Sequence, residues 1–145
     1  MGTTLTTAII YKDNLYVANV GDSRCYLLQD DEMKKITIDH SVVEELLRAN
    51  IITEAEAKNH PRRNHITRAM GTDDMVLVDI FKLKLKKDDK ILLATDGLTG
   101  CIDDDDIKNI IEKDNNIEVL SDELINMANE ASGKDNVSVI LIKRK

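Results

Sequence analysis

The chain has 145 residues, 42% of them hydrophobic and 32% charged, and its 27 acidic and 20 basic residues give a formal net charge of −7. A chain of this length can bury a core as one domain without disulfide or zinc crosslinks. The excess of acidic residues disfavours binding to nucleic acid. The longest apolar stretches are only a few residues long, so we expect no membrane-spanning segment.

The first forty residues predict a meander of antiparallel strands. Strands are expected over residues 5–11, 15–20 and 24–28, with polar turns at Lys12-Asp13-Asn14 and Gly21-Asp22. Cys25, in the third of these strands, lies far from Cys101, and neither has a Cys-x-x-Cys partner. We therefore expect both thiols to be reduced in a cytoplasmic protein.

Two helix starts follow. Ser41 with Glu44, and Thr53 with Glu56, each have the spacing of a capping box. His40 stands just before the first helix start, and we expect it to be a structural hydrogen-bonding residue rather than a catalyst.

Strand patterns return in the second half of the chain. Residues 81–85 alternate between apolar and lysine side chains, and 91–94 form a continuous apolar run typical of a buried strand. Apolar spacing predicts helices around 107–111 and 120–131, and a last strand is expected over 137–142. This order indicates an α+β fold with antiparallel sheets. No element precedes the first strand to cover it, so we expect a truncated domain.

Three aspartates lie where predicted strands meet loops: Asp22, Asp96 and Asp135. If the strand before Asp96 runs antiparallel to the strand after Asp135, both carboxylates emerge at the same edge of the sheet. Clustered carboxylates repel one another, and a hard divalent cation such as Mg²⁺ or Mn²⁺ removes that repulsion. Aspartates beside glycine or asparagine are also typical of turns, so spacing alone leaves both interpretations open.

Five motifs in this chain, in the same order, closely resemble the bacterial branch of the protein phosphatase 2C (PP2C, or PPM) family of metal-dependent serine/threonine phosphatases. The resemblance covers essentially all 145 residues. The motifs are Gly21-Asp22-Ser23-Arg24, Asp39-His40-Ser41, Asn64-His65-Ile66-Thr67-Arg68-Ala69-Met70-Gly71, Leu92-Leu93-Ala94-Thr95-Asp96-Gly97-Leu98 and Lys134-Asp135-Asn136-Val137-Ser138-Val139.

The resemblance implies a β-sandwich of two antiparallel sheets flanked by helices, with the amino-terminal elements missing. Residues 1–145 would form the carboxy-terminal portion of one phosphatase domain, with a flap at about 44–64. By resemblance, Asp96 and Asp135 match ligands of two catalytic Mn²⁺ or Mg²⁺ ions. Asp22 matches a residue that, with Asp96, holds a third and weaker ion.

The chain also departs from the family pattern. An early phosphate-binding arginine, an Asn-Glu-Asp segment and an Asp-Gly loop ending in histidine have no counterpart here. In the family that loop supplies the carboxylate that bridges the metals and a candidate general acid. We therefore expect no catalytic residue within this chain besides its metal ligands.

The resemblance implies that the complete domain hydrolyses phosphoserine and phosphothreonine in proteins, whereas this chain alone is inactive. The implied partners are phosphoprotein substrates and a cognate serine/threonine protein kinase. The exposed sheet edges of a truncated domain would also favour self-association. The alternative is a non-catalytic regulatory or interaction module derived from the same fold.

Overall fold

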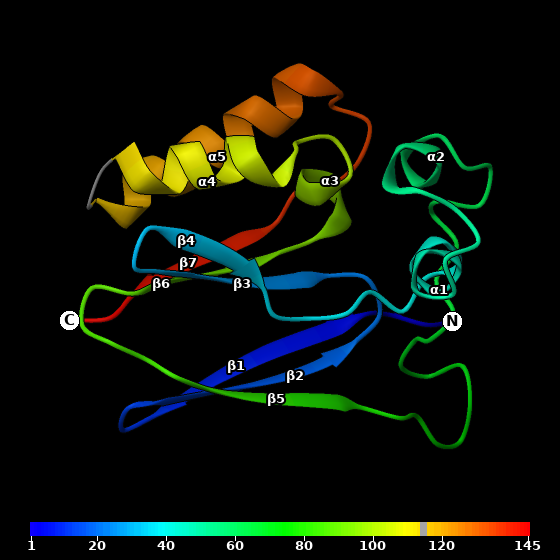
Figure 1. Cartoon of the computed structure of the whole chain (residues 1–145), viewed down its shortest axis with the longest axis horizontal. Coiled ribbons are helices and arrows are strands. Elements are labelled where there is room, and N and C mark those ends of the chain that lie inside the picture. Colours follow the sequence, from blue (N-terminus) through cyan, green and yellow to red (C-terminus); the bar gives the residue numbers. More distant parts are fainter. Residues whose placement is uncertain (114–115) are drawn as a thin grey trace.

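The computed structural model describes residues 1–113 and 116–145, which form two antiparallel sheets and a layer of helices (Figure 1). The first sheet has the strand order β1-β2-β5, and the second has the order β4-β3-β6-β7. The strands are β1 (Leu5–Tyr11), β2 (Asn14–Val20), β3 (Arg24–Gln29), β4 (Glu32–Lys35), β5 (Asp79–Lys84), β6 (Lys90–Ala94) and β7 (Val139–Lys143).

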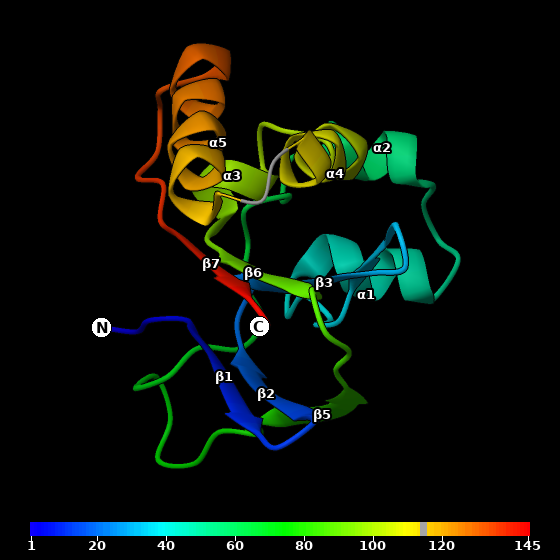
Figure 2. The same cartoon turned by 90° about the vertical axis from the view of Figure 1, so that its left-hand side faces the viewer.

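The helices lie on one side of the second sheet and at one end of the molecule (Figures 1 and 2). Helices α4 and α5 cover the face of the second sheet that points away from the first, while α1 and α2 lie at the end of the molecule where β6 runs into α3. The helices are α1 (Val42–Arg48), α2 (Glu54–Lys58), α3 (Asp96–Thr99), α4 (Asp104–Lys113) and α5 (Ile117–Ala131).

The second sheet separates two hydrophobic cores, because successive side chains of a strand point to opposite faces. Tyr26 and Leu92 face the helices and pack with Ile107 and Leu124 in one buried cluster. The intervening side chains, such as that of Ile91, face the first sheet and form the second cluster. This arrangement explains the continuous apolar run of β6, which is covered on both faces.

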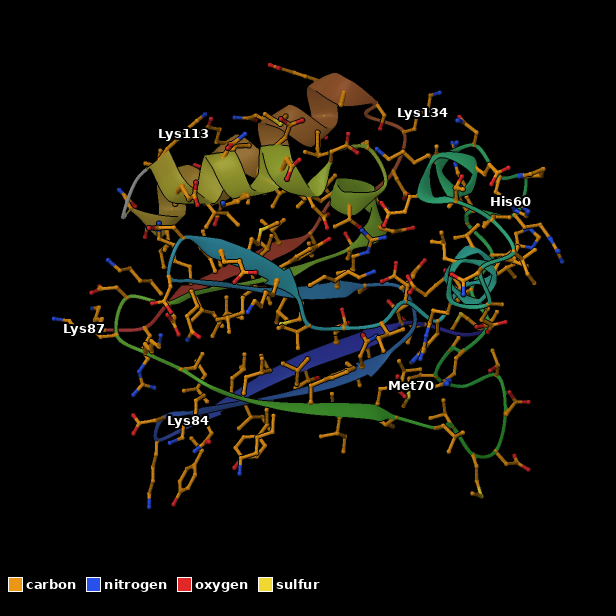
Figure 3. The ribbon with its side chains drawn as sticks, in the orientation of Figure 1. His60, Met70, Lys84, Lys87, Lys113 and Lys134 are labelled. Carbon is orange, nitrogen blue, oxygen red and sulfur yellow. The ribbon has the colours of Figure 1, made fainter. Side chains whose placement is uncertain are left out.

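The far face of the first sheet carries no helix in the described part of the chain. Apolar side chains on β1 and β5 are open to solvent there, with 60% of Ile9 and 73% of Ile80 exposed. Figure 3 shows side chains projecting from this face, with Lys84 labelled near one end of β5.

The fold class expected from the sequence is confirmed: the protein is α+β, with antiparallel sheets and flanking helices. Two elements were not predicted, the edge strand β4 and the four-residue helix α3, which places Asp96 in a helical turn rather than in a loop. The capping box at Thr53 is complete, whereas at Ser41 the Glu44 carboxylate pairs with Lys35.

Among the described residues, no helix is both long and apolar enough to cross a membrane.

Candidate metal site

The strand pairing brings the three predicted aspartates to one end of the second sheet. Strand β3 runs antiparallel to β6, and β6 runs antiparallel to β7, so that Ala94 is paired with Arg24 on one side and with Val139 on the other. The start of β3, the end of β6 and the start of β7 therefore coincide. Asp22 precedes β3, Asp96 follows β6 and Asp135 precedes β7.

Asp96 stands in the first turn of α3, which packs against residues 136–138, the segment that leads into β7. The Thr95 amide donates to the Ser138 carbonyl at 3.1 Å, and the Ser138 amide donates to Thr95 Oγ1 at 3.0 Å. A Cβ atom at Gly97 would lie 2.2 Å from the Asn136 carbonyl oxygen, so only glycine fits this approach. The close packing places Asp96 beside the segment that carries Asp135.

Asp22 is presented by a turn that also requires glycine. Gly21 has φ +108°, and a Cβ atom there would lie 2.3 Å from Thr4 Cγ2. His40 holds the turn through two hydrogen bonds, because the Gly21 amide donates to His40 Nδ1 at 2.9 Å and the His40 amide donates to the Gly21 carbonyl at 2.9 Å. Asp22 is half-buried in this arrangement, whereas Asp96 and Asp135 are exposed.

Neighbouring carboxylates disfavour the ionisation of Asp22 and of Asp96. Burial raises the pKa of Asp22, and the nearby charge of Asp96 raises it further. Partial desolvation of its carboxyl, although the residue as a whole is exposed, likewise raises the pKa of Asp96, and the Asp135 charge raises it further. Asp96 is thus the shared member of two repelling pairs, and a cation between the carboxylates would relieve both.

A hydrogen-bonded ion-pair network centred on Arg24 adjoins the aspartates. Arg24 grips the Asp39 carboxylate through Nε at 2.9 Å and Nη2 at 2.6 Å, and its Nη1 donates to the Tyr26 hydroxyl at 3.2 Å. Tyr26 in turn donates to Asp104 at the start of α4. The Arg24 charge lowers the pKa of Asp22 and Asp96 only as a lesser influence. Sequence reasoning missed the Arg24–Asp39 pair, because fifteen positions separate the two residues.

The donor chemistry fits part of a site for a hard divalent ion. Carboxylate oxygens are the ligands that Mg²⁺ and Mn²⁺ prefer, and such ions commonly keep several water ligands. Within residues 1–113 and 116–145, however, no three His, Cys, Asp or Glu side chains are close enough to hold one ion between them. At most two of Asp22, Asp96 and Asp135 would therefore contact the same ion, and water or further protein groups would complete its ligand set.

The predicted flap segment, residues 44–64, begins and ends next to the turn that carries Asp22. Ser41 and Ile66 form an antiparallel bridge at its base, and the Thr67 amide donates to the His40 carbonyl at 2.8 Å. Its far part is tied to the start of α4 by the exposed ion pair of Lys58 with Asp103, at 2.7 Å. Figure 3 labels His60, just after α2, at the same end of the molecule as Lys134, which precedes Asp135.

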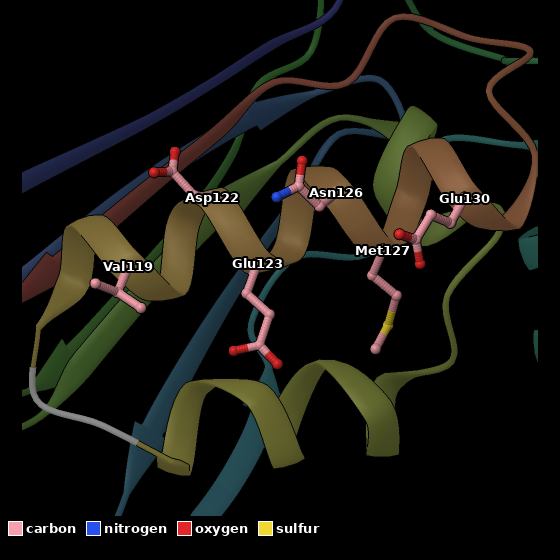
Figure 4. A pocket seen from close by; sticks show the side chains of 6 residues that line it. All are labelled: Val119, Asp122, Glu123, Asn126, Met127 and Glu130. Atoms are coloured by element: carbon pink, nitrogen blue, oxygen red, sulfur yellow. The ribbon is translucent and has the colours of Figure 1, made fainter.

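Two surface grooves lie away from the aspartates. One, of about 460 Å³, runs along α5 where it faces α4 (Figure 4). The other, of about 740 Å³, lies near the start of α5 and the end of β7. Asp22, Asp96 and Asp135 line neither of them. The three aspartates therefore lie at the end of the second sheet and outside both grooves.

Known proteins resemble the chain over nearly its whole length. The family model of Protein phosphatase 2C matches residues 1–137. The serine/threonine phosphatase stp of Listeria innocua is 42% identical over 144 residues, which cover 99% of this chain and 57% of the relative. The protein phosphatase PhpP of Streptococcus pneumoniae is 38% identical over 98% of this chain and 58% of the relative.

Solved structures share the fold closely. The Mycobacterium tuberculosis serine/threonine phosphatase PstP/Ppp superposes with a TM-score of 0.95 at 33% identity, covering 100% of this chain and 61% of that one. A structure of the PstP catalytic domain in complex with two manganese ions has a TM-score of 0.89 at 32% identity, covering 100% of this chain and 60% of that one.

The chain thus spans 57–58% of the length of these curated relatives. The family match extends over more than nine-tenths of its residues, and the whole chain superposes on a solved phosphatase structure. The chain belongs to the protein phosphatase 2C family.

Proposed function

We propose that the chain is the metal-binding part of a phosphatase domain that hydrolyses phosphoserine and phosphothreonine in proteins. The observation that carries this proposal is the meeting of Asp22, Asp96 and Asp135 at one end of the second sheet, in a member of this family. A cognate serine/threonine protein kinase would supply the phosphoprotein substrates. The free thiols Cys25 and Cys101 fit a cytoplasmic location.

In this proposal the three carboxylates hold Mn²⁺ or Mg²⁺, with Asp96 and Asp135 serving two catalytic ions and Asp22 with Asp96 serving a third. The bound ions would neutralise phosphate charge and make a water molecule more acidic. During hydrolysis a water oxygen forms a bond to phosphorus while the bond to the serine or threonine oxygen breaks. The attacking water gives up a proton, and the departing oxygen takes one up. The chain's own contribution is to hold the ions where the phosphate binds.

We further propose that these 145 residues alone do not hydrolyse phosphate esters. The bridging carboxylate and the acid histidine that the family uses belong to motifs that the chain does not contain. The described residues likewise hold no group of three His, Cys, Asp or Glu side chains within reach of one ion. An incomplete ligand set would bind metal weakly and activate water poorly.

Calorimetric titration with Mn²⁺ tests the metal assignment. We expect measurable binding by the unsubstituted chain, and a loss of at least about tenfold in affinity for Asp96→Ala, because Asp96 is the shared ligand. Asp122→Ala, which removes an exposed carboxylate on α5, is the matched control and should bind like the unsubstituted chain. Equal affinities for Asp96→Ala and the control would refute the assignment.

Turnover of p-nitrophenyl phosphate with Mn²⁺ tests the second proposal. The expected result is no rate above that of the Asp96→Ala variant. Turnover that Asp96→Ala abolishes would support the phosphatase site and show that the missing motifs are dispensable.

The exposed apolar face of the first sheet favours one alternative role, that of an interaction module. Its apolar side chains include Ile9, Tyr11 and Ile80, with 60%, 61% and 73% of each exposed. β1 is an edge strand and can pair with another strand. For the isolated chain, where no other chain is present, we propose that a second copy pairs along this edge.

A further inference from the structure

His40 lies buried between the proposed metal site and the flap segment, with only 5% of the residue exposed. Each of its polar groups has a partner. The backbone amide donates to the Gly21 carbonyl, the backbone carbonyl accepts from Thr67, and both ring nitrogens are engaged. A buried imidazole with its whole hydrogen-bonding capacity used is fixed in position.

The partners determine which ring nitrogen carries the proton. The Gly21 amide donates to Nδ1 at 2.9 Å, so Nδ1 must be an unprotonated acceptor. Nε2 therefore carries the hydrogen and donates it to Asp79 Oδ2 at 3.0 Å. His40 is a neutral imidazole in the Nε2–H form.

Asp79 is itself held in place. Its other oxygen accepts from Arg68 Nη1 at 2.9 Å, and the same nitrogen donates to the Leu77 carbonyl at 3.0 Å. Asp79 also opens β5, where it is paired with Asn19 at the end of β2. The Asn19 side chain donates to the Gly21 carbonyl at 3.3 Å. The Gly21 turn is thus held by a chain of hydrogen bonds that begins at Arg68.

From this geometry we infer that His40 is a positioning residue, which acts through the Gly21 backbone to hold Asp22 in place for a divalent cation. The inference rests on the proposed metal function of Asp22. His40 does not reach the ion, since its ring nitrogens are both occupied by Gly21 and Asp79. Its effect is to prevent the turn from adopting conformations in which the Asp22 carboxylate points away.

His40 also connects the turn to the base of the flap segment. Ser41, the next residue, caps α1 and bridges to Ile66, while the His40 carbonyl holds Thr67. The chain segments that enter and leave the flap are therefore both attached to His40, which also holds Gly21. A change in the flap base would be transmitted to Asp22 through His40.

A double-substitution cycle measured by Mn²⁺ calorimetry separates this role from a general effect on folding. Partners that orient metal ligands typically change metal affinity by about 10–100-fold, and we expect a loss of about tenfold for His40→Ala. Because His40 acts through Asp22, His40→Ala should cause no further loss in the Asp22→Ala background. An undiminished loss in that background would overturn the inference.

Two further variants keep the test informative if His40→Ala folds poorly. His40→Asn retains an acceptor near the Nδ1 position and should recover part of the affinity. His65→Ala removes an exposed histidine just beyond the flap segment and should bind Mn²⁺ like the unsubstituted chain. Equal losses for His40→Asn and His40→Ala would contradict a role for the Gly21 hydrogen bond.

Hydrogen exchange of the Gly21 amide gives a readout that needs no metal. Its hydrogen bond to Nδ1 should slow exchange in the unsubstituted chain, and His40→Ala should speed exchange at Gly21 far more than at β6 amides. If the unsubstituted chain binds no Mn²⁺, the proposed function fails, and the exchange rate still decides whether His40 holds the turn. An unchanged Gly21 rate in His40→Ala would refute it.

Discussion

At the scale of single residues, the cluster has a higher free energy than the same carboxylates would have if separated. The pKa of Asp96 is raised by burial and then by the charge of Asp135, and the pKa of Asp22 is raised by burial and then by the charge of Asp96. A carboxyl with a raised pKa binds its proton more tightly in the folded than in the unfolded state. Its effect on stability is therefore favourable in acid and is lost as the pH rises through the folded-state pKa.

The substitution Asp96→Asn should stabilise the metal-free protein at neutral pH. It removes the shared charge of both repelling pairs, and we expect a gain of at most about 1 kcal/mol because the group is exposed. The gain should be absent below about pH 3.9, where free aspartates are protonated, and should grow as the pH rises. Thermal unfolding over this range measures it, with Asp122→Asn as control, and a destabilised Asp96→Asn protein would contradict the electrostatic account.

At saturating Mn²⁺, the Asp96→Asn protein should instead be less stable than the unsubstituted protein. A bound ion stabilises the folded state by an amount that grows with the logarithm of its affinity, and Asp96→Asn should weaken this gain. A single substitution that stabilises the empty protein and weakens the loaded one is typical of a binding site.

At the scale of elements, the position of Asp96 depends on how closely α3 packs against the approach to β7. Gly97 permits this packing, since a side chain there would overlap the Asn136 carbonyl. Gly97→Ala should cost about 1–3 kcal/mol of stability through overpacking, measured by urea denaturation. It should also lower the Mn²⁺ affinity. Thr99→Ala in the same helix is the control, and equal behaviour of the two variants would exclude a special role for this approach.

The elements also show how far sequence reasoning reaches. The period-two pattern of β5 and the continuous apolar run of β6 predicted both strands, because burial on one or two faces leaves a direct trace in composition. Helix α3 left no such trace. It has four residues, too few for helical periodicity, and Asp96-Gly97 is equally typical of a turn.

The candidate site was predictable in part for the same reason. We assumed from the sequence that β6 and β7 pair antiparallel, which would bring Asp96 and Asp135 to the same end of the sheet. The observed register confirms the antiparallel pairing. The hydrogen bonds of His40 to Gly21 and Asp79 were not predictable, because they join residues 19 and 39 positions apart. Such contacts depend on the assembled tertiary structure and have no local pattern.

At the scale of the whole molecule, the second sheet is covered on both faces and the first sheet on only one. Helices α4 and α5 and the first sheet enclose the second sheet, whereas Ile9 and Ile80 on the first sheet remain open to solvent. Exposed apolar side chains on an edge strand favour strand-to-strand association.

The isolated chain should therefore self-associate in a concentration-dependent manner. Light scattering coupled to size-exclusion chromatography should detect dimers or larger species, and Ile9→Lys on β1 should shift the distribution toward monomer. Val119→Lys, which places the same charge at an exposed apolar position on α5, is the control. A monomer at all concentrations would contradict the proposed pairing.

The most direct test of the central claim is to locate Mn²⁺ on the chain by paramagnetic broadening of its amide resonances. If Asp22, Asp96 and Asp135 hold Mn²⁺ in the proposed pairs, the amides of Gly21, Gly97 and Asn136 should broaden first as Mn²⁺ is added, and Asp96→Ala should abolish the effect. Broadening centred instead on the acidic start of α4, or spread evenly over the acidic surface, would contradict the account.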